Sequence, residues 1–78
     1  MNNYVYYYVL TEQQHQMLLN YFGGSEYTDP FTEYNGMYYV EKNSFNEADF
    51  WMIMEENEDF AFDTTFWTLS TVPSSLWP

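Results

Sequence analysis

The segment EKNSFNEADFWMIMEENEDFAFD, residues 41–63, carries the helical pattern around which the rest of the chain is arranged. Ser44, followed three residues later by Glu47, matches the S-x-x-E capping box that opens many helices. On a helical wheel, one side of the predicted helix is apolar and the opposite side is acidic. The apolar side consists of Phe50, Trp51, Ile53 and Met54, and the acidic side of Asp49, Glu55, Glu56 and Asp59, with Ala48 and Met52 among them.

Carboxylates crowd the C-terminal end of this predicted helix, where the helix dipole disfavours each negative charge by about 0.3–1 kcal/mol. Glu55 and Asp59 also form a like-charge pair four residues apart, and no lysine or arginine follows Lys42 in the sequence. Residues that disfavour their own local structure, with no neighbouring interaction to offset the cost, are most often retained for function. We therefore predict a partner-binding surface made of Glu47, Asp49, Glu55, Glu56, Glu58, Asp59 and Asp63.

A strand is predicted over residues 4–10, YVYYYVL, because β-branched and aromatic residues alternate there. The tyrosines of this strand either cover a sheet or form an exposed row that contacts a partner, since tyrosine combines rigid contact area with a polar tip. Tyr6 and Tyr8 therefore join the candidate partner-binding residues. The strand would place Val5, Tyr7 and Val9 on one face and Tyr4, Tyr6 and Tyr8 on the other.

A first helix is predicted over residues 11–22. Thr11 and Gln14 form a T-x-x-Q capping box at its start. The pair Gly23-Gly24 would end it, because glycine adopts a left-handed backbone conformation without a steric penalty.

The dipeptide Asn35-Gly36 lies between two β-prone runs and is the strongest short-range signal for a β-hairpin. Residues 31–34 and 37–41 are predicted as the two strands of this hairpin. A loop over residues 25–30 would connect them to the first helix.

A last strand region is predicted over residues 60–62 and 65–72, with a turn or bulge between them, and Pro73 ends the pattern. Trp77 either packs on the sheet or stays free, and we expect packing. The element order is therefore βαββαβ. We predict a single domain over residues 1–78, of the α+β class, with a small antiparallel sheet and two helices on one face, ferredoxin-like in outline.

The charge balance restricts the partners. Twelve acidic residues against one lysine give a net charge of −11, which repels nucleic acid and anionic membranes and attracts basic surfaces. The absence of cysteine excludes disulfides and thiolate metal sites. Neither a signal peptide nor a membrane-spanning run is apparent, so we expect a cytoplasmic protein.

The chain offers little for catalysis, and we predict that it is not an enzyme. His15, at the flank of the apolar side of the first helix, is interpreted as a packed histidine. The run ENEDFAFD has oxygen ligands but lacks the central glycine and closing glutamate of a calcium loop, so no metal or cofactor is predicted. Direct nucleic-acid binding is not expected either, because base-stacking modules pair their aromatic residues with a basic groove.

A small, cysteine-free, strongly acidic domain with an acid cluster over residues 47–63 resembles phage-encoded inhibitors of host defence, the DNA-mimic anti-CRISPR and anti-restriction proteins. The resemblance implies action in the host cytoplasm on a basic nucleic-acid-binding protein, such as a Cas effector or a restriction enzyme. Carboxylates would occupy its DNA-binding surface in place of phosphates. The alternative is an acidic adaptor that binds a basic protein without competing with DNA. Both a monomer and a dimer remain open.

Overall fold

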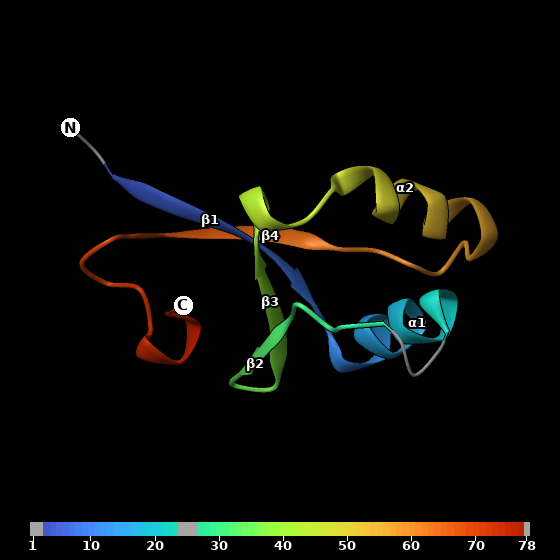
Figure 1. Ribbon diagram of the computed structural model, residues 1–78, viewed down its shortest axis with the longest axis horizontal. Coiled ribbons are helices and arrows are strands. Elements are labelled where there is room, and N and C mark those ends of the chain that lie inside the picture. The colour runs from blue at the N-terminus through green and yellow to red at the C-terminus, as the bar shows by residue number, and fades with distance from the viewer. Residues whose placement is uncertain (1–2, 24–26, 78) are drawn as a thin grey trace.

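In the part of the chain that the structure describes, four strands and two α-helices follow one another in the order β1, α1, β2, β3, α2, β4 (Figure 1). The computed structural model describes residues 3–23 and 27–77. The strands form one antiparallel sheet in the order β2-β3-β1-β4, which confirms the predicted α+β class and the βαββαβ order. The elements are β1 (Tyr4–Leu10), α1 (Glu12–Phe22), β2 (Thr32–Tyr34), β3 (Met37–Glu41), α2 (Glu47–Glu56) and β4 (Asp63–Thr68), with short 3-10 helices η1 (Lys42–Ser44) and η2 (Ser74–Leu76).

The β2–β3 hairpin forms where the sequence predicts it. Asn35 and Gly36 both have positive φ, 53° and 82°, as a two-residue type I′ turn requires. Tyr34 pairs directly with Met37, and the backbone N–H of Gly36 donates to the Glu33 carboxylate at 3.0 Å. The local turn chemistry therefore sets the register of this edge of the sheet.

The start and end of α1 also follow the sequence. The Thr11 hydroxyl accepts a hydrogen bond from the backbone N–H of Gln14, and the N–H of Gly23 donates to the Leu19 carbonyl. Gly23 has φ 32°, so glycine relieves strain at this position. The second residue of the predicted cap, Gly24, lies outside the described residues, as do two positions of the predicted loop.

Both helices cover the face of the sheet to which Tyr8 and Leu10 point. Val40 is the direct cross-strand partner of Tyr8 and so shares this face. Leu18 of α1 and Ile53 of α2 are fully buried against it. In Figure 1 both helices lie toward one end of the elongated molecule, which measures 40 × 22 × 20 Å. One apolar core therefore joins the two helices to the C-terminal half of β1.

The opposite face of the sheet carries a second group of aromatic rings. Tyr7 packs edge-on against Tyr39 and Trp67, with ring centroids 6.4 and 5.4 Å away. η2 lies against β2, and its Leu76 is buried. The expectation that Trp77 packs on the sheet is wrong: its side chain is 63% exposed, although its ring N–H donates to a backbone carbonyl at 3.0 Å.

Two predicted boundaries need correction. The last strand is β4 alone, since residues 60–62 run without strand pairing and residues 69–71 form a turn. Phe60 and Phe62 still point into the core, which explains why their segment looked like a strand. The second helix begins at Glu47 and not at Ser44, which belongs to η1.

Candidate functional site

The helix α2 is fixed at its start by Asn46. The side-chain oxygen of Asn46 accepts a hydrogen bond from the backbone N–H of Ala48 at 3.0 Å, so Asn46 is the N-cap. Glu47 is consequently the first residue of the helix, and the predicted capping box from Ser44 does not form. Glu47 and Asp49 still lie in the first turn, where the helix dipole favours negative charge.

The inner side of α2 is narrower than the helical wheel suggests. Phe50 and Ile53 are fully buried, whereas Trp51, expected in the core, is 54% exposed. The edge of the Trp51 ring rests near Phe62, at a centroid distance of 6.1 Å. Met52 is exposed as well. The outward side of α2 therefore carries a large aromatic ring and a thioether among its carboxylates.

The predicted carboxylates lie along α2, in the turn that follows it and at the start of β4. All but one are exposed; Asp49 is half-buried. We call this set, together with Trp51 and Met52, the α2 acidic surface. Its carboxylates are Glu47, Asp49, Glu55, Glu56, Glu58, Asp59 and Asp63.

The turn after α2 is held by a glutamine from α1. The Gln14 side-chain amide donates to the Asp59 carbonyl at 3.0 Å, and its oxygen accepts from the Ala61 N–H at 2.8 Å. Gln14 thus bonds the backbone as a neighbouring strand would, instead of completing the capping box at Thr11. Because α2 ends at Glu56, Glu58 and Asp59 lie beyond it, and the predicted i,i+4 repulsion between Glu55 and Asp59 on one helix is wrong.

No carboxylate of the α2 acidic surface forms an ion pair with any other described residue. Elsewhere in the described residues, the His15 ring nitrogen Nε2 and the Asp29 oxygen Oδ2 lie 2.7 Å apart, and the Tyr38 ring stacks on the histidine. Lys42 lies instead over the rings of Tyr6 and Tyr8, at 5.8 and 5.6 Å. Within residues 3–23 and 27–77, the carboxylates of this surface therefore have no cationic partner at ion-pair distance.

Electrostatic effects of the acids reach the core. Burial raises the pKa of Tyr8 above its ordinary value, and the negative charge of Glu47 raises it further. Burial likewise raises the pKa of Tyr7, with a second contribution from Glu41. Both hydroxyls therefore remain protonated at neutral pH.

The expected row of exposed tyrosines exists only in part. Tyr6 is 48% exposed, but Tyr8 is 3% exposed, so Tyr8 is not available to a partner. The Tyr8 ring is enclosed by edge-on contacts to Phe45, Phe50 and Phe62. The helices cover the half of this face of β1 that carries Tyr8 and leave the half that carries Tyr6 exposed. The alternation of residues in the sequence is the same in both halves, so it does not indicate where the covered half ends.

An exposed aromatic residue of β4 was missed. Phe66 is 56% exposed and lies directly across from Tyr6, with a ring centroid distance of 5.5 Å. Tyr4 contacts the same ring edge-on at 5.3 Å. The pairing of β1 with β4 brings these three rings together. The sequence shows that Tyr4 and Tyr6 share one face of β1, because they are two residues apart, but it does not show that Phe66 lies beside them.

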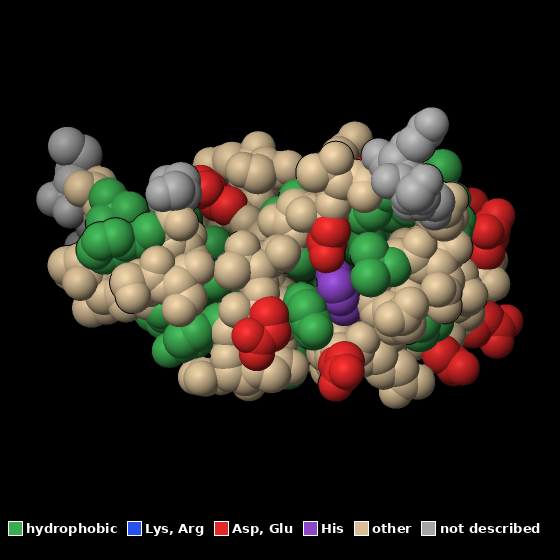
Figure 2. Space-filling view, turned by 60° about the horizontal axis from the view of Figure 1, so that its bottom comes forward, with side chains coloured by type: hydrophobic (Ala, Val, Ile, Leu, Met, Phe, Trp, Pro, Cys, Tyr) green, Lys and Arg blue, Asp and Glu red, His purple; other side chains and the backbone are tan. Residues whose placement is uncertain are grey.

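Figure 2 shows carboxylates distributed over one face of the molecule, several of them at the helical end, and no lysine or arginine on that face. Across residues 3–23 and 27–77, no three histidine, aspartate or glutamate side chains are placed to share a metal ion. None of the helices in those residues has the length and apolarity needed to cross a bilayer. Comparison of the chain with family models, curated proteins and solved structures gave no match.

Proposed function

We propose that the protein inhibits a nucleic-acid-binding complex of host defence, in the host cytoplasm, by acting as a DNA mimic. The α2 acidic surface would occupy the basic surface with which that complex binds DNA. The partner would be a Cas effector or a restriction enzyme, and the inhibitor itself would catalyse nothing. This proposal rests on charge placement and on the resemblance to acidic phage inhibitors.

The observation that best supports this proposal is that the seven carboxylates form no ion pairs with the described residues. An acidic side chain that serves only solubility is commonly accompanied by lysine or arginine, yet no cation of residues 3–23 and 27–77 forms an ion pair with any of the seven carboxylates. Glu55 and Glu56 lie in the last turn of α2, where the dipole opposes them. Unneutralised charge that destabilises the free protein becomes favourable once a basic partner neutralises it.

The dimensions of the surface are compatible with a short stretch of DNA backbone. From Glu47 to Glu56 the helix rises about 14 Å at 1.5 Å per residue. Duplex DNA spaces the charges of each strand about 3.4 Å apart along its axis. Glu58, Asp59 and Asp63 prolong the acidic run beyond the helix, so the surface offers several charges over a distance that a DNA-binding groove would cover.

The second candidate is an adaptor that binds a basic protein outside its DNA site. The exposed Trp51 and Met52 favour this alternative, because large apolar side chains contribute to protein interfaces and have no counterpart in a phosphate backbone. The two functions differ in a single property, which is competition with DNA.

A competition experiment separates them. The purified defence nuclease would be loaded with fluorescent duplex DNA and titrated with the protein, while anisotropy reports release of the DNA. Mimicry predicts release together with loss of DNA cleavage, and weaker inhibition as salt increases. Formation of a ternary complex of nuclease, DNA and protein would instead establish the adaptor.

Charge reversal on α2 tests the surface itself. Glu55→Lys combined with Glu56→Lys should weaken nuclease binding at least 100-fold, because two attractive contacts become repulsive. The folding stability should stay equal or rise slightly, since both lysines suit the C-terminal end of a helix. As a matched control, Glu33→Lys on the edge strand β2 makes the same charge change as either single substitution, and it should weaken binding far less. Equal weakening by Glu33→Lys and Glu56→Lys would refute the site.

A further inference from the structure

The strand β1 is paired on both sides for only half of its length. β4 pairs with it from Tyr4 to Val9, but β3 pairs with it only from Tyr7 onward. β3 ends at Glu41, and the chain then turns into η1. Consequently, within residues 3–23 and 27–77 no strand lies beside Tyr4–Tyr6 on the side away from β4.

The direction of the backbone groups at this open edge follows from the ladder. In an antiparallel pair, successive residues direct their N–H and C=O groups alternately toward one neighbour and then the other. The Leu69 N–H donates to the Asn3 carbonyl at 3.0 Å, which places Asn3 and Val5 among the residues that face β4. The N–H groups of Tyr4 and Tyr6 therefore face the open side.

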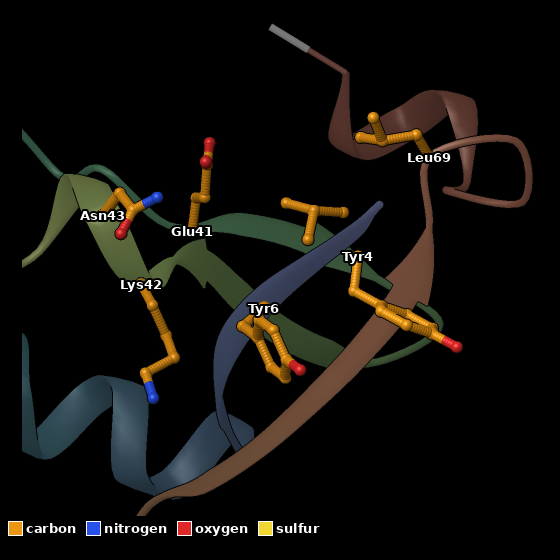
Figure 3. A pocket seen from close by; sticks show the side chains of 7 residues that line it. Tyr4, Tyr6, Glu41, Lys42, Asn43 and Leu69 are labelled. Atoms are coloured by element: carbon orange, nitrogen blue, oxygen red, sulfur yellow. The ribbon is translucent and has the colours of Figure 1, made fainter. Parts of the chain in front are cut away.

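A cavity of about 320 Å³ lies along the same edge (Figure 3). Side chains from both faces of the sheet border it: in Figure 3 Glu41 points to one side of β1 and Lys42 to the other. Tyr4, Tyr6 and Leu69 are all exposed there. The residues that line the cavity are Tyr4, Val5, Tyr6, Glu41, Lys42, Asn43 and Leu69.

We propose that this edge binds an extended, basic segment of a partner protein as an added strand beside β1. The added strand would continue the line that β3 leaves at Glu41 and would accept or donate backbone hydrogen bonds at Tyr4 and Tyr6. Its side chains would alternate, so that one set packs on the exposed rings of Tyr4, Tyr6 and Phe66 and the other set reaches the Glu41 side.

Charge decides the chemistry of the occupant. The chain has a net charge of −11, and its one lysine, Lys42, lies on the Tyr6 side of the cavity while Glu41 borders the opposite side. An added segment is therefore favoured when its lysine or arginine side chains face Glu41 and its apolar side chains face the rings, and an acidic segment is disfavoured. The same charge argues against a second copy of this chain at the edge, because two such molecules repel each other. The α2 acidic surface contributes to the net charge but does not touch the added strand, and the proposal stands whether or not the protein mimics DNA.

Peptide binding tests the proposal on the intact protein. The probe is a capped seven-residue peptide of alternating lysine and valine, added to the ¹⁵N-labelled chain and followed by NMR. We expect saturable shifts of the amide resonances of Tyr4, Tyr6 and Lys42, and slower hydrogen exchange at Tyr4 and Tyr6. A peptide with glutamate in place of lysine, and one with proline in place of valine, should both bind at least about tenfold more weakly.

Variants at Tyr4 separate the backbone contact from the ring contact. Tyr4→Ala removes the ring, whereas Tyr4→Pro removes the ring and the N–H that faces the open edge, at a strand start where proline is tolerated. Tyr4→Pro should bind the lysine–valine peptide about fivefold more weakly than Tyr4→Ala, the loss of roughly one hydrogen bond. Thermal unfolding of both variants verifies that the fold is kept.

Three results would overturn the proposal. One is equal binding of the proline-containing and valine-containing peptides by the unaltered protein, which needs no folded variant. Another is a set of shifts confined to α2, which would assign peptide binding to the acidic surface. The third is concentration-dependent dimerisation through Tyr4–Tyr6 in the absence of peptide, which would make a second copy the occupant.

Discussion

Residues of one type have different environments in this protein, and the tyrosines show it most clearly. Tyr6 and Tyr8 are two residues apart on the same face of β1, yet one is half exposed and the other is enclosed by phenylalanines. Tyr27 is a third case: its ring stacks on Phe22 at 4.8 Å, and its buried hydroxyl has no hydrogen-bond partner among the described residues. An unsatisfied buried hydroxyl destabilises the folded state.

Replacing Tyr27 with phenylalanine should therefore stabilise the protein. The substitution keeps the ring contact and removes the unsatisfied group, so the free energy of unfolding should rise by about 0.5–1 kcal/mol. Chemical denaturation at neutral pH measures this change. Tyr21→Phe, at a half-buried position on α1, is the control and should change stability less. A loss of stability in Tyr27→Phe would show that the hydroxyl has a partner.

The same substitution should alter the response to alkaline pH. Burial and, to a lesser extent, the charges of Asp29 and Asp49 together raise the pKa of Tyr27 from 10.0 to about 12. The folded state thus holds this proton more tightly than the unfolded state, so its contribution to stability is complete below pH 10 and is lost as pH rises toward 12. Tyr27→Phe should make the decline of stability over that range shallower.

At the scale of elements, the start of a helix is set by the residue whose side chain accepts hydrogen bonds from the free N–H groups of the first turn. Ser44 and Asn46 are both good N-cap residues, and the sequence pattern favours Ser44 because Glu47 follows it at the right distance. The chain instead forms η1 at Ser44 and begins α2 after Asn46, which directs Phe50 and Ile53 into the core. Burial of these two side chains outweighs a second bond in a capping box.

Alanine substitutions distinguish the two caps. Asn46→Ala should lower the free energy of unfolding by about 1 kcal/mol, because the bond to the Ala48 N–H is lost. Ser44→Ala should change it by less than about 0.5 kcal/mol, because Ser44 is exposed and lies outside α2, in the short helix η1, without a side-chain cap bond. Urea titrations of both variants give the comparison, and the opposite ranking would restore the cap at Ser44.

For the whole molecule, charge and core act against each other. Within residues 3–23 and 27–77, no lysine or arginine forms an ion pair with a carboxylate, so such pairs do not relieve the self-repulsion at a net charge of −11. The aromatic core that spans β1, α1 and α2 supplies the opposing stabilisation. Salt should therefore affect folding and partner binding in opposite directions.

Added salt should raise the thermal midpoint of this protein by several degrees between low ionic strength and about 0.5 M sodium chloride, because screening weakens self-repulsion. Differential scanning calorimetry measures the midpoint. The charge-reversed variant Glu55→Lys with Glu56→Lys is four units less negative, and its midpoint should rise less. Sodium sulfate at equal ionic strength separates screening from the exclusion of ions at the protein surface. A midpoint that falls with sodium chloride would contradict this account.

The sequence alone determined the features that depend on neighbours in the chain. The I′ turn at Asn35-Gly36, the cap at Thr11 and the alternation of β1 follow from local backbone and side-chain chemistry. The element order and the acidic character of α2 follow from the same patterns. These features need no knowledge of what packs against them.

Only the tertiary structure decided which half of β1 the helices cover. That boundary buries Tyr8 and leaves Tyr6 exposed, and the packing of α2 leaves Trp51 at the surface. The side chain of Gln14 does not bond the start of its own helix but donates a hydrogen bond to the backbone carbonyl of Asp59, 45 residues away in the sequence. These outcomes have one physical reason. Burial and long-range hydrogen bonds depend on elements that are distant in sequence, and the pattern of a single sequence does not show which of these elements pack together.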